Sequence, residues 1–216
     1  MQYRRYGKKG PEISRLGFGV MRLPPRSRKN AWGRVNFTRG VPLLRSALEA
    51  GVNFFDSHHN YHGGDSEEAI GRALKGWRGH RVYVQTKTPM YRMECKLDDF
   101  KRMLETALAK LGVDCIDYLL FHMMKKETFE KRGRMFFRLT DWAMKRGYVA
   151  HRGFSSHDKP EHIRAFIDTG EFSACLLSYN WMDRRVADAI DHAAAAGMGV
   201  TVMNPVGGGK LAADAD

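Results

Sequence analysis

Cysteine is scarce in this sequence and long apolar runs are missing, and each shortage argues against a class of protein. The three cysteines, Cys95, Cys115 and Cys175, are odd in number, far apart and outside any C-x-x-C pair. We therefore expect a reducing, cytoplasmic setting, with no disulfide scaffold and no metal site. No apolar run approaches the roughly 20 residues that cross a bilayer. The first residues lack the apolar segment of a secretory signal, so we expect neither a membrane span nor a leader.

Acidic residues are fewer than basic ones. The 24 Asp and Glu against 36 Lys and Arg give a net charge of +12. Such a balance can mark a nucleic-acid surface, because clustered basic side chains neutralise phosphates. Here the basic residues are scattered in separate short groups, such as Arg26 to Lys29 and Lys125-Lys126, and no nucleic-acid motif accompanies them. We therefore expect solvated faces that attract an anionic cofactor, and no nucleic-acid partner.

Predicted helices and strands alternate along most of the 216 residues, a length that suits one domain. Stretches with helical apolar spacing, several of them ended by glycine, separate short apolar runs. The predicted strands are 16–19, 52–56, 82–87, 115–122, 151–155, 174–179 and 199–203. The predicted helices start near residues 38, 65, 97, 127, 160 and 183, with an irregularity at Gly133 in the fourth. The first 15 or so residues resemble a hairpin outside this alternation.

Two architectures fit this alternation: an open doubly wound sheet and a closed (β/α)₈ barrel. The open sheet usually carries a G-x-G-x-x-G turn after its first strand, and Gly17 to Arg22 lacks that fingerprint. Polar residues at the ends of several consecutive strands favour the barrel, whose site lies at the C-terminal rim. The predicted fold is therefore one α/β domain over residues 1–216. It is a (β/α)₈ TIM barrel, C-terminally incomplete, with about seven strand–helix units and an N-terminal β-hairpin.

Three predicted strands end in a polar residue, namely Asp56, Lys87 and His122. Because parallel strands end at one rim, these side chains are expected to converge, and Tyr61 in the following loop adds a phenol. An ammonium lowers the pKa of a nearby phenol from its usual value of about 10. Asp56 can hold Lys87 ionised, and His122 can orient a carbonyl oxygen. The set can protonate an alkoxide, but carbonyl reduction also needs a hydride, for which a nicotinamide is the economical source.

Several longer motifs occur in order along the chain. Gly51 to Tyr61 reads G-x-N-x-x-D-S-H-x-x-Y, and Leu108 to His122 reads L-x-x-L-G-x-D-x-I-D-Y-x-x-x-H. Thr86-Lys87, Gly153 to Ser156 and Tyr179-Asn180 follow the same order. These motifs resemble those of the aldo-keto reductase family, whose first motif has Thr-Ala in place of Ser-His. The chain is most similar to a bacterial and archaeal branch that often carries a C-terminal ferredoxin-like iron–sulfur segment, which is absent here.

The resemblance implies a catalytic tetrad and a cofactor site. The tetrad would be Asp56, Tyr61, Lys87 and His122, with Tyr61 donating a proton while an aldehyde or ketone takes a hydride from NADPH or NADH. The residues that would contact the nicotinamide nucleotide are Gly19, Val20 and Met21 after the first strand, Ser155 and Ser156 at the carboxamide, and Met203 and Asn204 under the ring.

The sequence also departs from this family. Leu176 stands near a common Gln that binds the carboxamide, Met203 near a common aromatic residue, and Ser156 replaces a common Asn. A barrel of this type takes ~250 residues, so we expect its eighth strand to be missing. Two strand edges would then be unpaired and open to another copy, a partner or a missing C-terminal segment. The alternative function is a non-catalytic or partner-dependent barrel that acts as a binding subunit.

The loop after Asp56 is rich in histidine, with His58, His59 and His62. A metal site is one interpretation of this cluster. The three lie in one loop without helical or C-x-x-C spacing, which favours loop polarity or substrate lining. Nothing in the sequence identifies the carbonyl substrate.

Overall fold

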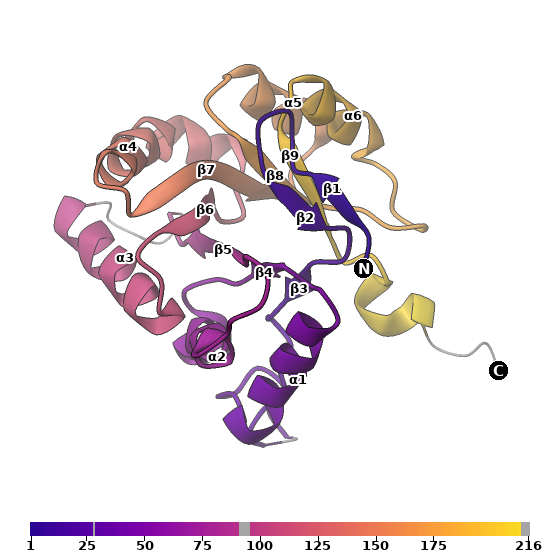
Figure 1. The fold of residues 1–216 in the computed structure, drawn as a ribbon. Coiled ribbons are helices and arrows are strands. Elements are labelled where there is room, and N and C mark those ends of the chain that lie inside the picture. Colours follow the sequence, from indigo (N-terminus) through magenta and orange to yellow (C-terminus); the bar gives the residue numbers. More distant parts are fainter. Residues whose placement is uncertain (28, 91–95, 213–216) are drawn as a thin grey trace.

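The structure, a computed structural model, describes residues 1–27, 29–90 and 96–212. Parallel strands form a curled sheet, and helices lie along its outer side (Figure 1). The strands of this sheet are β3 (Phe18–Gly19), β4 (Phe54–Asp56), β5 (Tyr83–Thr88), β6 (Ile116–Phe121), β7 (Val149–Ser156), β8 (Ala174–Ser178) and β9 (Gly199–Met203). The helices are α1 (Phe37–Glu49), α2 (Asp65–Leu74), α3 (Leu97–Leu111), α4 (Lys126–Lys145), α5 (Pro160–Asp168) and α6 (Ala187–Ala195).

The order of the seven strands in the sheet is their order in the chain, β3 to β9. A doubly wound sheet would instead reverse its strand order at a switch point. Within the described residues, β3 and β9 are the two edges of the sheet. An antiparallel hairpin of β1 (Tyr3–Arg5) and β2 (Glu12–Ser14) precedes it. The predicted barrel, incomplete at its C-terminal side and preceded by a hairpin, is therefore confirmed.

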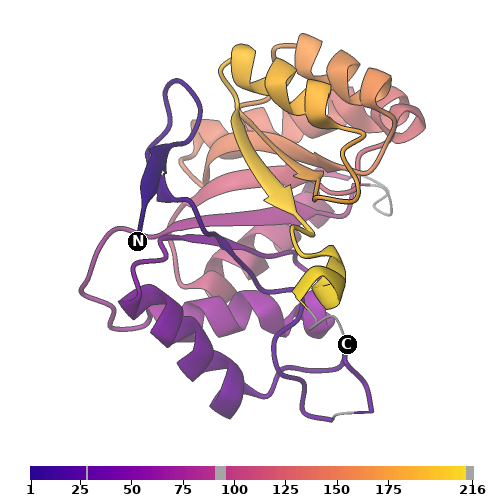
Figure 2. The ribbon, with the colours of Figure 1, turned by 90° about the vertical axis from the view of Figure 1, so that its right-hand side faces the viewer.

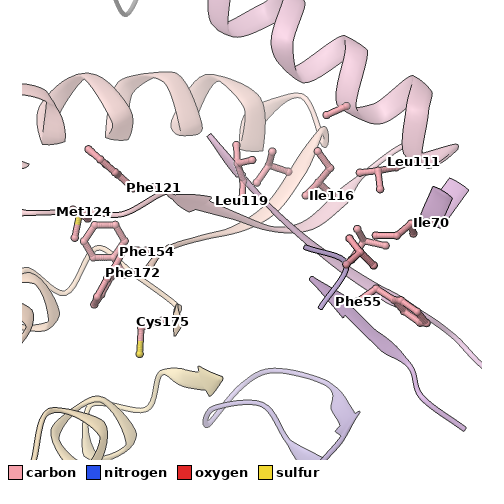
Figure 3. Packing of buried hydrophobic residues seen from close by; sticks show 14 of the residues in the cluster. Phe55, Ile70, Leu111, Ile116, Leu119, Phe121, Met124, Phe154, Phe172 and Cys175 are labelled. Atoms are coloured by element: carbon pink, nitrogen blue, oxygen red, sulfur yellow. The ribbon is translucent and has the colours of Figure 1, made fainter. Parts of the chain in front are cut away.

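Side chains on the strands alternate between two apolar clusters, because successive residues of a strand point to opposite faces. Phe55, Leu119 and Phe154 point outward and pack with the helices in the larger core (Figure 3). Phe54 and Leu120 point inward and belong to a smaller cluster that fills the barrel interior. The barrel interior is thus a packed apolar core rather than a channel.

The hairpin closes the end of the barrel where the strands begin, near the start of β9 (Figure 2). Tyr6, only 5% exposed, packs its ring 5.3 Å from that of Phe54 and 5.0 Å from that of Tyr118. A Cβ atom on Gly199 would lie 2.6 Å from the Tyr6 ring, so the first residue of β9 has to be glycine. The Tyr6 hydroxyl lies 3.4 Å from that of Thr201, within reach of a hydrogen bond.

The helix predicted from Asp183 begins later, at Ala187. The Asn180 side chain accepts the backbone N–H groups of Met182 and Asp183, at 2.8 and 2.9 Å. A side-chain acceptor of this kind offers the backbone a turn in place of the first helical hydrogen bonds. The prediction was wrong at this boundary because it followed apolar spacing alone.

The sequence predicts an irregularity at Gly133 in the fourth helix. This prediction was wrong, because α4 runs unbroken from Lys126 to Lys145. A Cβ atom at Gly133 would lie 2.6 Å from the ring of Phe129. The glycine therefore serves close packing of this ring on the helix.

No helix in the described part of the chain is long and apolar enough to cross a membrane. Cys115 and Cys175 carry free thiols, and Cys95 lies outside the described residues.

Replacing Tyr6 with Ala should lower the free energy of unfolding by about 3–5 kcal/mol, as is typical when a large buried aromatic side chain is removed. Urea unfolding of the variant measures this loss. Tyr3→Ala is the matched control on the same hairpin, because Tyr3 is 41% exposed and its hydroxyl donates a hydrogen bond to the Gly51 carbonyl. This substitution should lower the free energy of unfolding by about 1 kcal/mol or less. Equal losses for the two variants would contradict closure of the barrel by Tyr6.

Candidate active site

Lys87 lies at the centre of the predicted tetrad. Its side chain is 1% exposed, and its ammonium group donates hydrogen bonds to both carboxylate oxygens of Asp56, at 2.7 and 2.6 Å. A third bond, of 2.5 Å, runs to the backbone carbonyl of Ser57. A buried charge needs such compensation, because burying an unpaired ammonium is very costly.

The period of the strands explains why these side chains meet. Asp56 is two residues beyond Phe54, and His122 two beyond Leu120, so both share the inward face with these apolar residues. Lys87 pairs with Leu120 across β5 and β6. Because the strands are parallel, the polar residues all lie at the rim where the strands end, above the apolar interior.

Tyr61 joins this group from η1 (Tyr61–Gly64), a short 3₁₀ helix after β4. The Lys87 ammonium lies 5.2 Å from the centre of the Tyr61 ring. The His122 ring lies 6.1 Å from the Tyr61 ring and nearly perpendicular to it, at 84°. The structure therefore brings together all four residues predicted for the tetrad.

Burial and charge determine the ionisation of the site. Burial lowers the pKa of Lys87, while the Asp56 carboxylate opposes that shift. Burial, followed by the Lys87 charge, lowers the pKa of His122 to about 3. His122 is therefore a neutral imidazole near pH 7. A neutral imidazole has one N–H group to donate and one nitrogen to accept.

The backbone is strained next to these residues. Among the described residues, the non-glycine positions with a positive φ angle are three: His62 at 54°, Met123 at 50° and Asn204 at 62°. They directly follow Tyr61, His122 and Met203, which are residues predicted for the tetrad or the cofactor. Conformations of this kind cost about 1–3 kcal/mol each and cluster at functional sites.

His62 keeps its strained conformation through two hydrogen bonds. Its Nε2 accepts the backbone N–H of Leu23 at 3.2 Å, and its Nδ1 lies 2.6 Å from the Gly33 carbonyl, which assigns the proton to Nδ1. Asp65 accepts the backbone N–H of Val35 and the Nε–H of Arg34. The segment before α1 is thus fixed against the turn that carries Tyr61, and His62 has a structural role.

The residues predicted for the cofactor after the first strand lie at the same rim. Gly19 pairs with Asp56 in the register of β3 and β4, and a Cβ atom on Gly19 would meet no atom within 4 Å. Val20 is fully buried and donates its backbone N–H to the Asp56 carbonyl at 2.9 Å. Met21 is 36% exposed. The open space lies over Gly19, next to the tetrad carboxylate.

Ser155 and Ser156 end β7 and are buried. Ser155 Oγ accepts the backbone N–H of Met123 at 3.0 Å, so its hydroxyl proton is available for another acceptor. Ser156 Oγ donates to the Met124 carbonyl and accepts the backbone N–H of Asp158. Both serines thus hold the turn after His122, and Ser155 retains a donor.

Met203, Asn204 and Leu176 come from β8 and β9. Met203, half-buried, packs against the interior cluster to which Leu176 belongs. The Asn204 carbonyl accepts a hydrogen bond from the Asn180 side chain at 3.2 Å. At the rim beside β8 and β9, the apolar Met203 and Leu176 thus lie next to a polar Asn180–Asn204 contact.

Two buried polar residues at the site were missed in the sequence. Gln85 donates to Asp56 at 2.8 Å, and its position two residues before Lys87 would have placed it on the same face. Glu67 in α2 accepts the Thr86 hydroxyl at 2.6 Å, and burial raises its pKa. In the sequence Glu67 lies three residues before the apolar Ile70, and residues three apart are neighbours on a helix surface. This spacing could have placed Glu67 on the buried face of α2.

A cavity of about 720 Å³ lies beside the tetrad rather than over it. Its described lining comes from the ends of β7 and β8, the start of α4, the first turn of α5 and the segment just before α6. Ser156 and His157 belong to this lining, and His157 is near enough to His122 to lower its pKa. The cavity is therefore a neighbour of the site.

Fold and rim together define a (β/α) barrel with a polar site where its strands end. The sequence model of the Aldo/keto reductase family matches residues 15–216, so the chain belongs to that family. It is 30% identical over 164 residues to an aldo-keto reductase of Mycobacterium sp. strain JLS, covering 74% of this chain and 51% of that protein.

Two further likenesses extend this result. Over 93 residues, or 40% of this chain and 25% of the relative, the sequence is 34% identical to a probable voltage-gated potassium channel subunit beta of Oryza sativa subsp. japonica. The fold matches an aldo-keto reductase from Bacillus halodurans, in its holo form, with a TM-score of 0.81 at 24% identity, covering 97% of this chain and 68% of that one. The chain thus spans a quarter to about half of these two curated relatives.

The neutral state of His122 predicts a loss of stability in acid. Between pH 6.5 and about 3 the unfolded chain binds a proton at this residue that the folded chain does not. The free energy of unfolding should therefore fall as the pH falls, by about 2 kcal/mol from this residue at pH 5. Urea unfolding at pH 7.5 and 5.0 measures the effect. Between these two pH values, the free energy of unfolding of His122→Gln should fall by about 2 kcal/mol less than that of the wild type. An identical pH dependence of both proteins would contradict the shifted pKa.

Proposed function

We propose that this protein reduces an aldehyde or ketone with a nicotinamide cofactor, NADPH or NADH, and that Tyr61 donates the proton. The observation that carries the proposal is the buried Lys87 ammonium, held by Asp56 and placed 5.2 Å from the Tyr61 ring. A positive charge favours ionisation of a phenol and so makes Tyr61 a better proton donor. We further propose a reducing, cytoplasmic setting, in keeping with the free thiols of Cys115 and Cys175.

Each residue has a defined part in this proposal. Asp56 keeps Lys87 charged against the opposing effect of burial. His122, neutral near pH 7, donates one N–H to the carbonyl oxygen and so orients it towards Tyr61. When bound, the nicotinamide supplies the hydride. Tyr61 then gives its proton to the oxygen as negative charge develops there.

The described residues fit a nicotinamide nucleotide on one side of the rim. Gly19 leaves open space beside Asp56, as close approach of a ligand requires. Ser155 retains a hydroxyl proton that can be donated to a carboxamide oxygen. Met21, Met203 and Asn204 lie at the same rim and would complete the contacts, whereas the Ser156 hydroxyl is already engaged with Met124 and Asp158.

A second candidate function is that of a binding subunit. Two observations favour it: Leu176 is apolar and 5% exposed where the family commonly binds the carboxamide, and β3 and β9 are edge strands of the described sheet. Edge strands readily accept another strand. The name of the rice relative, a probable voltage-gated potassium channel subunit beta, describes a subunit of a larger assembly. In this case the barrel would recognise another protein, or a second copy, through its open edges.

Replacing Tyr61 with Phe should lower kcat by about 10²–10⁴-fold, because the proton donor is lost. The dissociation constants of NADPH and NADH, measured by nucleotide fluorescence, should stay within about twofold, since the rest of the rim is unchanged. Tyr3→Phe removes a phenol from the exposed hairpin and should leave kcat unaltered. A Tyr61→Phe variant with wild-type turnover would contradict the mechanism.

The nucleotide titration also separates the two candidates. Saturable binding of NADPH or NADH, followed by turnover in a carbonyl screen, supports the reductase. A folded chain that binds neither nucleotide, and that elutes as a stable oligomer on size exclusion with light scattering, supports the binding subunit.

A further inference from the structure

We propose that His58 is a positioning residue that holds the His122 ring against Tyr61; this rests on the proposed function. His58 lies in the histidine-rich loop after β4, at the position where the aldo-keto reductase motif has Ala. It is 4% exposed, so its imidazole is a buried part of the site.

The His58 ring lies against both rings that would handle the carbonyl oxygen. Its centre is 4.1 Å from that of His122, with 40° between the planes. The centre of the Tyr61 ring lies 5.0 Å away on a similar tilt of 50°. The centres of the Tyr61 and His122 rings are themselves 6.1 Å apart, farther than either is from His58. His58 therefore shares a contact with each ring and fixes how one lies relative to the other.

His58 is itself held by three hydrogen bonds. Its Nδ1 accepts the backbone N–H of Asn60 at 3.2 Å. Its carbonyl oxygen accepts the backbone N–H of Tyr61 at 3.1 Å and the Ser66 hydroxyl at 3.2 Å. Ser66 belongs to α2 and also contacts the Ser57 hydroxyl, at 2.9 Å. The backbone of His58 is thus tied to α2, and its ring is tied to the backbone of Asn60.

His122 has a particular need for such support. It follows β6 directly, and Met123 after it has a strained backbone, so the chain turns sharply at the imidazole. Orientation errors of about 1 Å in a reacting group can lower rates by about 10²-fold. A neighbouring ring that is fixed by its own hydrogen bonds restricts rotation of His122 about its side-chain torsions.

The test compares two substitutions at His58. Phe keeps a ring at this position, whereas Ala removes it. We expect His58→Ala to lower kcat at least tenfold while the KM of the carbonyl compound and the nucleotide dissociation constants change less than twofold. His58→Phe should retain kcat within about threefold. His151→Ala is the control, since it removes an imidazole that stacks on Tyr118 in the interior, 5.0 Å away; it should change kcat less than threefold.

A second readout does not depend on turnover. The second readout is the NMR spectrum of protein with ¹³C-labelled histidine rings, in which the His122 signal is assigned by its loss in His122→Gln. This signal should shift and broaden in His58→Ala and stay sharp in His58→Phe. A wild type that reduces no carbonyl compound would refute the proposed function. In that case, the change or constancy of the His122 signal in His58→Ala would still decide whether His58 positions His122. An unchanged signal and kcat in His58→Ala, or equal defects in both variants, would overturn the inference.

Discussion

The hydrogen-bonded ion pair between Lys87 and Asp56 is the interaction on which the arrangement of this site depends. Lys87 is 1% exposed, and removing one partner of a buried pair typically costs about 3–5 kcal/mol. The pair therefore requires β4 and β5 to be neighbours in parallel register, with both residues on the inward face. Gln85 in β5 and the carbonyl of Ser57, the residue just after β4, supply further hydrogen bonds. The position of the charge is thus fixed by the sheet and not by a loop.

The rest of the barrel keeps that charge away from water on its lower side. Phe54 and Leu120 lie one step below the rim on the inward face, and Tyr6 closes the far end. This apolar filling explains why burial lowers the pKa values of Lys87 and His122 in spite of their polar neighbours. The low polarity also strengthens the electrostatic interaction between the ammonium and the Tyr61 ring, which lie 5.2 Å apart. Packing inside the barrel thus contributes to the pKa shifts of residues at its rim.

Much of this could be predicted from the sequence, because period-two spacing and strand ends are local properties. Alternation along Phe54 and Asp56 alone places the carboxylate inward. The late start of α6 depends on the Asn180 side chain capturing backbone N–H groups, which apolar spacing does not report. Gly133 is likewise explained by the Phe129 ring that packs on it. The place of His58 depends on the loop after β4 meeting the turn after β6 in space, which the sequence does not report. The sequence alone therefore left His58 between a metal site, loop polarity and substrate lining.

The strained turns complete the physical account of the rim. Tyr61, His122 and Met203 each precede a residue in the left-handed region, so the chain leaves the rim abruptly after each of them. Such turns are retained only where surrounding contacts over-determine them. At His62 these contacts are the bonds to Leu23 and Gly33, and at the turn after His122 they come from the two serines of β7. The strain is therefore offset by hydrogen bonds from segments distant in sequence. Those segments hold Tyr61 and His122 in place at the rim.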